Sequence, residues 1–211
     1  MSKMVSLDWA EKSRPKTLAD CVLPPRLRSP LTRMVADGFV RNTLLHGPVG
    51  TGKTSTTSAI CNQLGADVFS VNGCLQKGIA DLRSGVVEFA VSGSVYGRPK
   101  VVVIDEAEGL TPDYQAALRG VIDKTVTNCG FMLVTNTPSA ISTALHSRCL
   151  ALDFRPRPEE EPAVRQGYLD RIHTILRAEE TSCTDDQIVE VFRSFPDFRQ
   201  MLKVLQNECG R

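Results

Sequence analysis

The chain has 211 residues, of which 42% are hydrophobic and 23% charged, and its formal net charge at pH 7 is +1. This length allows one full α/β domain and a small second one. The small net charge excludes a polybasic protein that coats nucleic acid through bulk electrostatics. No apolar run approaches the ~18 residues of a membrane span, and the N-terminus has no apolar signal core. We therefore expect a cytoplasmic protein that makes no membrane contact.

Charge is distributed unevenly along the chain. Residues 1–100 carry 13 Lys and Arg against 7 Asp and Glu, whereas residues 101–211 carry 12 against 17. This asymmetry is typical of a molecule with one basic face, and equally of two differently solvated surfaces.

The seven cysteines are scattered and never spaced as C-x-x-C. Such a pattern indicates reduced, mostly buried thiols. It does not favour a structural zinc site, because the ligands of such sites usually include closely spaced cysteine pairs.

Five apolar runs predict β-strands. They are NTLLH (42–46), DVFSV (67–71), KVVVID (100–105), GFMLVT (130–135) and LALDF (150–154). Segments typical of helices begin near Gly52, Gly78 and Thr111, and Thr111 with Pro112 is a good helix start. Strands that are apolar throughout and alternate with helices predict a parallel sheet covered on both faces.

The character of the chain changes after about residue 156, where prolines interrupt a charged stretch. Three helical segments follow, over residues 160–179, 184–194 and 197–208. The second opens with a capping box, Thr184 and Gln187. The third carries an apolar stripe at i, i+3, i+4 and i+7, made of Phe198, Met201, Leu202 and Leu205. We therefore predict an α/β domain over residues 1–156 and a small all-helical domain over 157–211.

A phosphate-binding loop is the first chemical motif. GPVGTGKT, residues 47–54, fits G-x-x-x-x-G-K-[ST], follows a predicted strand and opens a predicted helix, as the motif requires. Its glycines let backbone N–H groups face phosphate oxygens, and the helix N-terminus adds partial positive charge. Lys53 would hold the β- and γ-phosphates, and the Thr54 hydroxyl would be a magnesium ligand. The predicted nucleotide-binding residues here are Gly47, Pro48, Val49, Gly50, Thr51, Gly52, Lys53, Thr54 and Ser55.

Two carboxylates follow a buried strand in VVVIDEAE, residues 101–108. The strand would deliver Asp105 to the C-terminal edge of the sheet, where it organises magnesium through the water shell of the ion. Glu106 would polarise the attacking water as general base, which predicts hydrolysis as well as binding; the alternative is a strand that ends in solvated acids. Asn136, at the end of a further strand, would orient the same water, contact the γ-phosphate, or serve as an ordinary turn residue.

Together and in this order, these motifs resemble the ATPase subunits of sliding-clamp loaders, members of the AAA+ superfamily. WAEKSRPKTLADCVLP resembles the EKYRP opening of the family, HSRC its Ser-Arg-Cys motif, and FPDFRQMLKVLQ its second sensor helix. The similarity spans residues 9–208 and leans towards the large subunit of the T4-type phage loader. The resemblance implies a Rossmann-like parallel-sheet P-loop AAA+ ATPase domain followed by a small all-helical lid domain. It also implies ATP and Mg²⁺ as cofactors, with Arg14 and Pro15 beside the adenine.

The resemblance assigns further residues. Arg148 of HSRC would act in trans as an arginine finger on the γ-phosphate of a neighbouring subunit, a task suited to a planar, permanently charged guanidinium; the alternative is a surface charge at the end of a short helix. Arg199 would be the second sensor, although its pattern equally permits a solvated arginine. Asn136 would be the first sensor. Gln115 would couple DNA contact to Glu106.

Partners also follow from the resemblance: a sliding clamp, other clamp-loader subunits in a hetero- or homo-oligomeric ring, and primer-template DNA. LQKGIADLR resembles the segment of the family that faces the duplex backbone, so Lys77 and Arg83 are candidate phosphate contacts. Solvated charges at a helix start are the alternative. With no aromatic residues interleaved, DNA binding would be directed to the backbone and sensitive to salt.

Two features depart from the family. The chain lacks the four-cysteine zinc module that bacterial loaders carry near the phosphate loop, and we find no third, helical collar domain after the lid. We expect a clamp-loader ATPase subunit acting in DNA replication, in the cytoplasm of a bacterial host if it is phage-encoded. The alternatives are another AAA+ motor, such as a helicase loader or branch-migration ATPase, or a nucleotide-binding structural subunit with little turnover.

Overall fold

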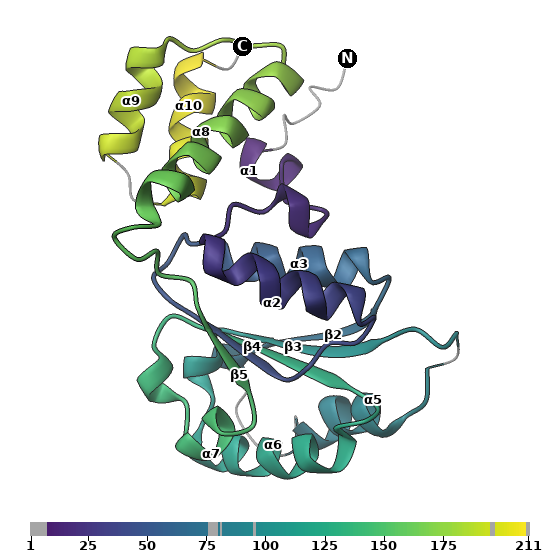
Figure 1. The fold of residues 1–211 in the computed structure, drawn as a ribbon. Helices are drawn as coiled ribbons and strands as arrows, with labels where there is room; N and C mark the ends of the chain where they lie inside the picture. The colour runs from purple at the N-terminus through teal and green to yellow at the C-terminus, as the bar shows by residue number, and fades with distance from the viewer. Residues whose placement is uncertain (1–7, 76–79, 81, 95, 195–196, 210–211) are drawn as a thin grey trace, which may run out of the picture.

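The computed structural model describes residues 8–75, 80, 82–94, 96–194 and 197–209. Five strands form one parallel sheet in the order β2-β3-β4-β1-β5 (Figure 1). Their bounds are β1 Thr43–His46, β2 Asp67–Asn72, β3 Lys100–Asp105, β4 Gly130–Thr135 and β5 Leu150–Asp153. Every strand predicted from an apolar run is confirmed.

Helices cover both faces of this sheet, as the alternating pattern predicts (Figure 1). On one face lie α2 (Pro25–Ala36) and α3 (Lys53–Gln63). On the other lie the π-helical η3 (Leu82–Val87), α5 (Glu88–Val91), α6 (Pro112–Thr125) and α7 (Thr143–His146). The predicted start of α6 is confirmed, since the Thr111 side chain accepts a hydrogen bond from the backbone of Tyr114. The helix expected near Gly78 begins outside the described residues.

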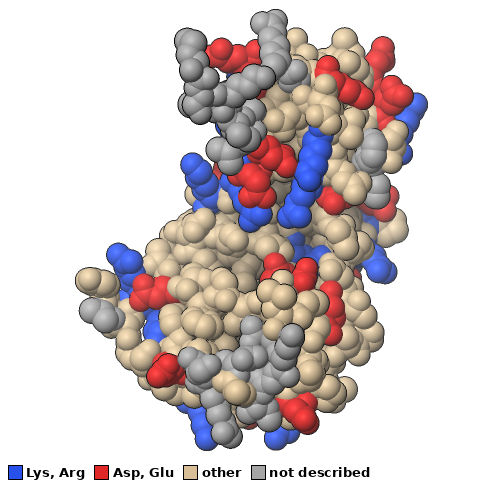
Figure 2. Space-filling model, turned by 180° about the vertical axis from the view of Figure 1, so that it is seen from behind, with Lys and Arg blue, Asp and Glu red and all other residues tan. Residues whose placement is uncertain are grey.

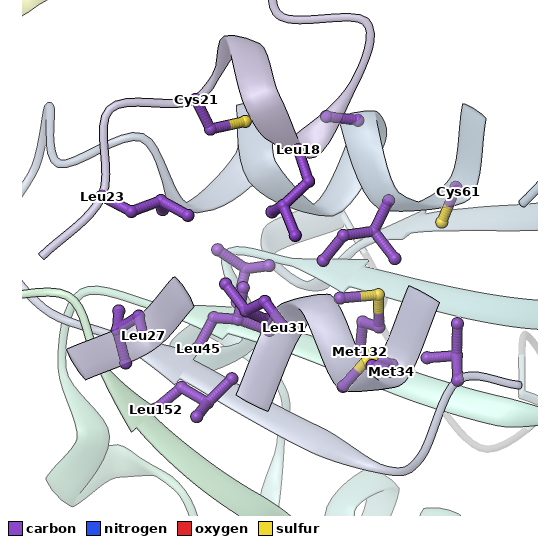
Figure 3. Close-up of a cluster of buried hydrophobic side chains, with 14 of the residues drawn as sticks. Leu18, Cys21, Leu23, Leu27, Leu31, Met34, Leu45, Cys61, Met132 and Leu152 are labelled. Carbon is purple, nitrogen blue, oxygen red and sulfur yellow. The ribbon is translucent and has the colours of Figure 1, made fainter. Parts of the chain in front are cut away.

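The apolar strands supply two hydrophobic clusters, one on each face of the sheet. Along β3, Val101 and Val103 face one cluster, and Val102 and Ile104 face the other, because successive side chains of a strand point to opposite sides. Figure 3 shows the first cluster, in which Leu31 of α2 packs with residues of β1 and β4. Leu31 is fully buried, and each such side chain contributes about 1.5–3 kcal/mol by leaving water.

The C-terminal region forms the three expected helices, α8 (Glu161–Ala178), α9 (Asp185–Ser194) and α10 (Phe198–Cys209). The capping box is confirmed: the Thr184 backbone donates to Gln187 Oε1 at 2.9 Å, and the Gln187 backbone donates to Thr184 Oγ1 at 3.3 Å. The predicted stripe of α10 faces the interior of this bundle, where Met201, Leu202 and Leu205 are buried. We call α8, α9 and α10 the lid.

The first helix, α1 (Trp9–Lys12), packs against the lid although it stands at the other end of the chain (Figure 1). Trp9 is 4% exposed and belongs to the lid cluster, and its backbone N–H donates to Gln206 Oε1 at 2.9 Å. Lys12 forms an ion pair with Glu179 at 2.8 Å. The boundary at residue 156 stays a prediction, but the lid core includes a residue from the N-terminal segment.

Two cysteines depart from the expectation of reduced thiols. Cys183 and Cys209 form a disulfide across a separation of 26 residues. The prediction is wrong for this pair because two scattered cysteines give no sign that folding will bring them together. Cys21, Cys61 and Cys129 are buried free thiols, and burial raises the pKa of each to about 11.

The side of the molecule that Figure 2 displays is not the single basic face that the charge asymmetry permits. Among the residues coloured there, basic and acidic side chains are interspersed. Within the described part of the chain, no helix is long and apolar enough to span a bilayer.

Candidate nucleotide-binding site

A cavity of about 450 Å³ lies where the C-terminal edge of the sheet meets the N-terminal segment and the lid. Because β4 lies between β1 and β3, the residues that follow these three strands meet at one edge, as expected in open parallel sheets. The predicted site residues that line the cavity are Arg14, Pro15, Val49, Gly50, Gly52, Lys53, Thr54, Ser55, Asp105, Glu106, Asn136 and Arg199.

The phosphate loop connects β1 to α3 and contains residues in the left-handed region. Gly52 has φ +85° and forms the N-cap of α3, a conformation that a side chain would strain. Gly50 has φ +81° and lies against the lid, because a Cβ placed on it would be 2.8 Å from Asp197 Oδ1. Glycine is therefore needed at both positions, and at Gly50 it also permits the close approach of the lid.

Lys53 points into this loop. Its ammonium group donates to the carbonyl oxygens of Gly47, at 2.9 Å, and Pro48, at 2.7 Å. The residue is 5% exposed, and burial lowers its pKa, an effect that the nearby carboxylates of Glu108 and Asp105 oppose. The loop thus holds a positive charge among backbone groups, an arrangement suited to bind phosphate.

Thr54 and Asp105 fit a magnesium site. The Thr54 hydroxyl, at the start of α3, donates to Asp105 Oδ1, at the end of β3, over 3.3 Å. Mg²⁺ prefers oxygen ligands and is usually held by one or two protein groups together with waters and phosphates, so this pair matches its requirements. When bound, the ion would neutralise charge on the β- and γ-phosphates.

Glu106 lies beside the pair in a strained backbone conformation, with φ +51°. Its carboxylate accepts a hydrogen bond from Asn72 Nδ2 at 3.0 Å. A hydrogen bond to Glu106 raises the pKa of the Cys74 thiol. Sequence reasoning missed Asn72, although it ends β2 in register with Asp105. A polar residue at the end of an otherwise strand-like run was the available signal.

Asn136 follows β4, between the phosphate loop and Asp105. Its backbone N–H and side-chain Nδ2 donate to Glu108 Oε1, at 3.2 and 3.0 Å. Burial raises the pKa of Glu108, but hydrogen bonds from its own backbone, Thr135 and Asn136 bring it below its ordinary value. Glu108 is therefore a charged anchor that orients Asn136 at the cavity, a role that the sequence did not suggest.

The opposite wall comes from the N-terminal segment and the lid. Arg14 pairs with Glu11 at 2.7 Å, and Arg171 of α8 donates to the carbonyl oxygen of Ser13 at 2.8 Å. Tyr168 of α8 stacks on Phe198 of α10 with ring centroids 4.8 Å apart, one residue before Arg199. Tyr168 and Arg171 also line the cavity, and sequence reasoning missed both because helix periodicity does not show which residues face a ligand.

Several predicted residues lie outside the cavity lining, namely Gly47, Pro48 and Thr51 of the phosphate loop, Arg148 and Gln115. Arg148 follows α7 and forms a bidentate ion pair with Asp123 of α6. Gln115, also on α6, is buried; its amide donates to the carbonyl oxygens of Leu110 and Ala140 and accepts from the Ser142 backbone. Its described hydrogen bonds do not include one to Glu106.

The two candidate DNA contacts are not open to structural description. Lys77 lies outside the described residues. The backbone of Arg83 belongs to η3, but its side chain lies outside the description. Both assignments stay predictions.

A phosphate loop after β1, a carboxylate pair after β3 and a helical lid over the sheet edge define a nucleotide-binding protein of the P-loop α/β class. The family described as "ATPase family associated with various cellular activities (AAA)" matches residues 43–155. The chain therefore belongs to the AAA family of ATPases.

Several similar proteins are named as subunits of replication factor C or of a sliding-clamp loader. The chain is 34% identical over 210 residues to mouse replication factor C subunit 5, covering 96% of the chain and 60% of that protein. It is 33% identical over 207 residues to the sliding-clamp-loader large subunit of Escherichia phage RB69, covering 95% and 64%. The chain thus spans less than two thirds of the length of these relatives. The Thermotoga maritima RuvB Holliday junction branch migration motor shares the fold, with a TM-score of 0.69 at 19% identity over 92% of this chain and 64% of that one.

Proposed function

We propose that this chain is the ATP-hydrolysing portion of a sliding-clamp-loader subunit. ATP binding would hold a sliding clamp on primer-template DNA, and hydrolysis would release both during DNA replication. Relatives named as replication factor C and clamp-loader subunits, similar over almost the whole chain, support this function. These relatives favour a clamp-loader function over the alternative of a branch-migration ATPase, because the similarity to the branch migration motor is limited to the fold.

The position of Arg148 is the observation that carries the proposal. Residues of the phosphate loop, the proposed magnesium ligands and the proposed base line one cavity, yet Arg148 is not among the residues that line it. Arg148 lies at the end of α7, where its side chain is 31% exposed. A guanidinium that is excluded from its own site and accessible from outside can serve a neighbouring one, where it would stabilise charge that develops on the transferred phosphoryl group.

Within one subunit, the remaining residues have complementary proposed roles. Lys53 and the phosphate loop bind the phosphates, and Thr54 and Asp105 hold magnesium. Glu106 accepts a proton from the attacking water. Asn136 and Arg199 sense the γ-phosphate from the sheet and from the lid, and Arg14 and Pro15 lie beside the adenine.

The test is steady-state ATP hydrolysis against protein concentration, with and without primer-template DNA and a sliding clamp. A trans-acting loader subunit should show activity that rises more than linearly with concentration and increases when both ligands are present. Arg148→Ala should keep ATP binding while hydrolysis falls by about 10³-fold or more. Arg41→Ala is the matched control, since Arg41 is also an arginine paired with an aspartate, Asp37, but on the exposed surface.

Three results would overturn the proposal. The first is Arg148→Ala hydrolysing normally in the assembled protein. The second is a rate that is strictly proportional to concentration and indifferent to DNA and clamp. The third is stimulation by four-way DNA junctions in place of primer-template and clamp, which would favour the branch-migration alternative.

A further inference from the structure

Arg148 is held in a defined orientation by its own subunit. Its Nε donates to Asp123 Oδ1 at 2.7 Å, and its Nη2 donates to Asp123 Oδ2 at 3.0 Å. Nη1 donates to the carbonyl oxygen of Ala144 at 2.8 Å. Paired N–H···O bonds between a planar guanidinium and a carboxylate fix both the direction and the rotation of the arginine, so the side chain is not a freely moving surface charge.

The geometry leaves one edge of the guanidinium available. Of its five N–H groups, Asp123 takes two along the Nε side, and Ala144 takes one at Nη1. The other N–H of Nη1 makes only a long contact of 3.4 Å with the Ser147 hydroxyl. The second N–H of Nη2 has no hydrogen-bond partner within the described part of the chain. Nη1 and Nη2 form the terminal edge with which an arginine can bind a phosphate bidentately, and a phosphate there would replace the long contact with Ser147.

Electrostatics keep the pair charged. The hydrogen bond from Arg148 lowers the pKa of Asp123, against the opposing effect of burial, and the charges of Arg148 and Arg119 lower it further. The same hydrogen bond raises the pKa of Arg148. Asp123 therefore stays a carboxylate at neutral pH, and the guanidinium stays oriented.

Helix α6 connects this pair to the active site of the same chain. The helix starts just after the loop that carries Glu106 and Glu108, and Asp123 lies in its last turn, two residues before its end at Thr125. Gln115 of the same helix binds the carbonyl oxygen of Ala140 and the N–H of Ser142, immediately before α7. Two side chains of one rigid helix thus hold the segment that presents Arg148.

We propose that Asp123 is a positioning residue that presents the terminal edge of the Arg148 guanidinium to a phosphate of the nucleotide in a neighbouring subunit. The inference rests on the proposed function, since it needs Arg148 to act in trans. Orientation in advance reduces the freedom that the side chain must lose when it meets the phosphate. A carboxylate that merely restrained Arg148 would have the opposite effect, because its removal would speed hydrolysis.

The test uses two inactive variants of the complete protein that restore each other. Glu106→Gln lacks the base but supplies Arg148, whereas Arg148→Ala keeps the base but lacks the finger. When the two variants are mixed, activity should return at interfaces where a Glu106→Gln chain supplies Arg148 to the nucleotide site of an Arg148→Ala chain. Absence of recovery would overturn the trans role of Arg148 and, with it, this inference.

Asp123→Asn is then placed on one chain at a time. On the Glu106→Gln chain it should lower the recovered rate by up to about 100-fold, with the KM for ATP unchanged; on the Arg148→Ala chain it should have no effect. Asp123→Glu on the Glu106→Gln chain, which supplies Arg148, should restore part of the rate, because it restores the carboxylate. The control is Asp37→Asn, which breaks the exposed Asp37–Arg41 pair and should leave the rate unchanged.

Two outcomes would contradict the role of Asp123 while leaving the trans finger intact. One is an unchanged or faster hydrolysis rate when Asp123→Asn is placed on the Glu106→Gln chain, which supplies Arg148. The other is an equal loss whichever chain carries the substitution, since this would point to a general structural effect and not to an effect through Arg148.

Discussion

The two ends of the nucleotide cavity are built in different ways. The phosphate end comes from short segments that each follow a strand, so its geometry depends on the sheet alone. The opposite end combines the N-terminal segment with α8 and α10. The Arg171–Ser13 and Trp9–Gln206 hydrogen bonds hold these parts together across separations of 158 and 197 residues. The proposed phosphate contacts thus come from local segments, whereas the opposite wall of the cavity requires the two ends of the chain to come together.

The largest expected effect separates chemistry from binding. Glu106→Gln removes the proposed base, and hydrolysis should fall about 10²- to 10⁴-fold. The residue is exposed and its neighbours in the phosphate loop are unchanged, so ATP affinity should stay near that of the unmodified protein. Steady-state rates with a fluorescent-nucleotide titration would check both. Loss of binding in parallel with rate would contradict a role confined to the chemical step.

Trp9→Ala should break the opposite end while sparing the phosphate end. Trp9 is 4% exposed in the lid cluster, and removal of a buried aromatic ring of this size costs about 3–5 kcal/mol. Hydrogen exchange should show loss of protection in α8, α9 and α10 but not in β1, β3 and β4. The control is Leu31→Ala in the cluster of Figure 3, which should expose the strands first. Equal loss in both regions would show that they unfold as one unit.

Two glycine substitutions test how the ends meet. Gly50→Ala and Gly52→Ala both place a side chain at positive φ, which costs about 1–2 kcal/mol. A Cβ on Gly52 meets nothing within 4 Å, whereas one on Gly50 would be 2.8 Å from Asp197 Oδ1. Gly50→Ala should therefore weaken ATP binding more than Gly52→Ala, since the lid must also withdraw. Isothermal titration of both variants checks this, and equal affinities would contradict the lid contact.

The smallest expected effect depends on pH. Asp20 accepts hydrogen bonds from the Thr17 hydroxyl and the backbones of Thr17 and Lys16. The bond from the Thr17 side chain is the main reason why its pKa lies below the usual 3.8, against the opposing effect of burial. A carboxyl group whose pKa is lower in the folded state than in the unfolded state stabilises the fold at pH values above its unfolded-state pKa. This stabilisation is lost as the pH falls through the folded-state pKa.

Asp20→Asn should therefore lower the free energy of unfolding by about 1 kcal/mol at pH 7. The difference from the unmodified protein should shrink as the pH falls below about 4, where the carboxylate of the latter becomes protonated. Urea unfolding at a series of pH values measures this. A difference that stays constant down to pH 2 would exclude ionisation of Asp20 as the cause.

Sequence patterns predicted much of the fold because they are local. The phosphate loop, the strand before Asp105 and the capping box at Thr184 each need only neighbouring residues, so their positions could be read in advance. The disulfide between Cys183 and Cys209 and the burial of Trp9 among lid helices could not, since neither residue type nor spacing indicates which distant segments meet.

By itself, therefore, the sequence determined the parallel sheet, the helical lid and the residues that we propose to contact phosphate and magnesium, because period, glycine spacing and strand ends are properties of short segments. Only the tertiary structure decided that Asn72 holds Glu106, that Glu108 holds Asn136 and that Asp123 orients Arg148. Each of these contacts joins residues from different elements. Their partners are chosen by strand order and helix packing, which no local pattern contains.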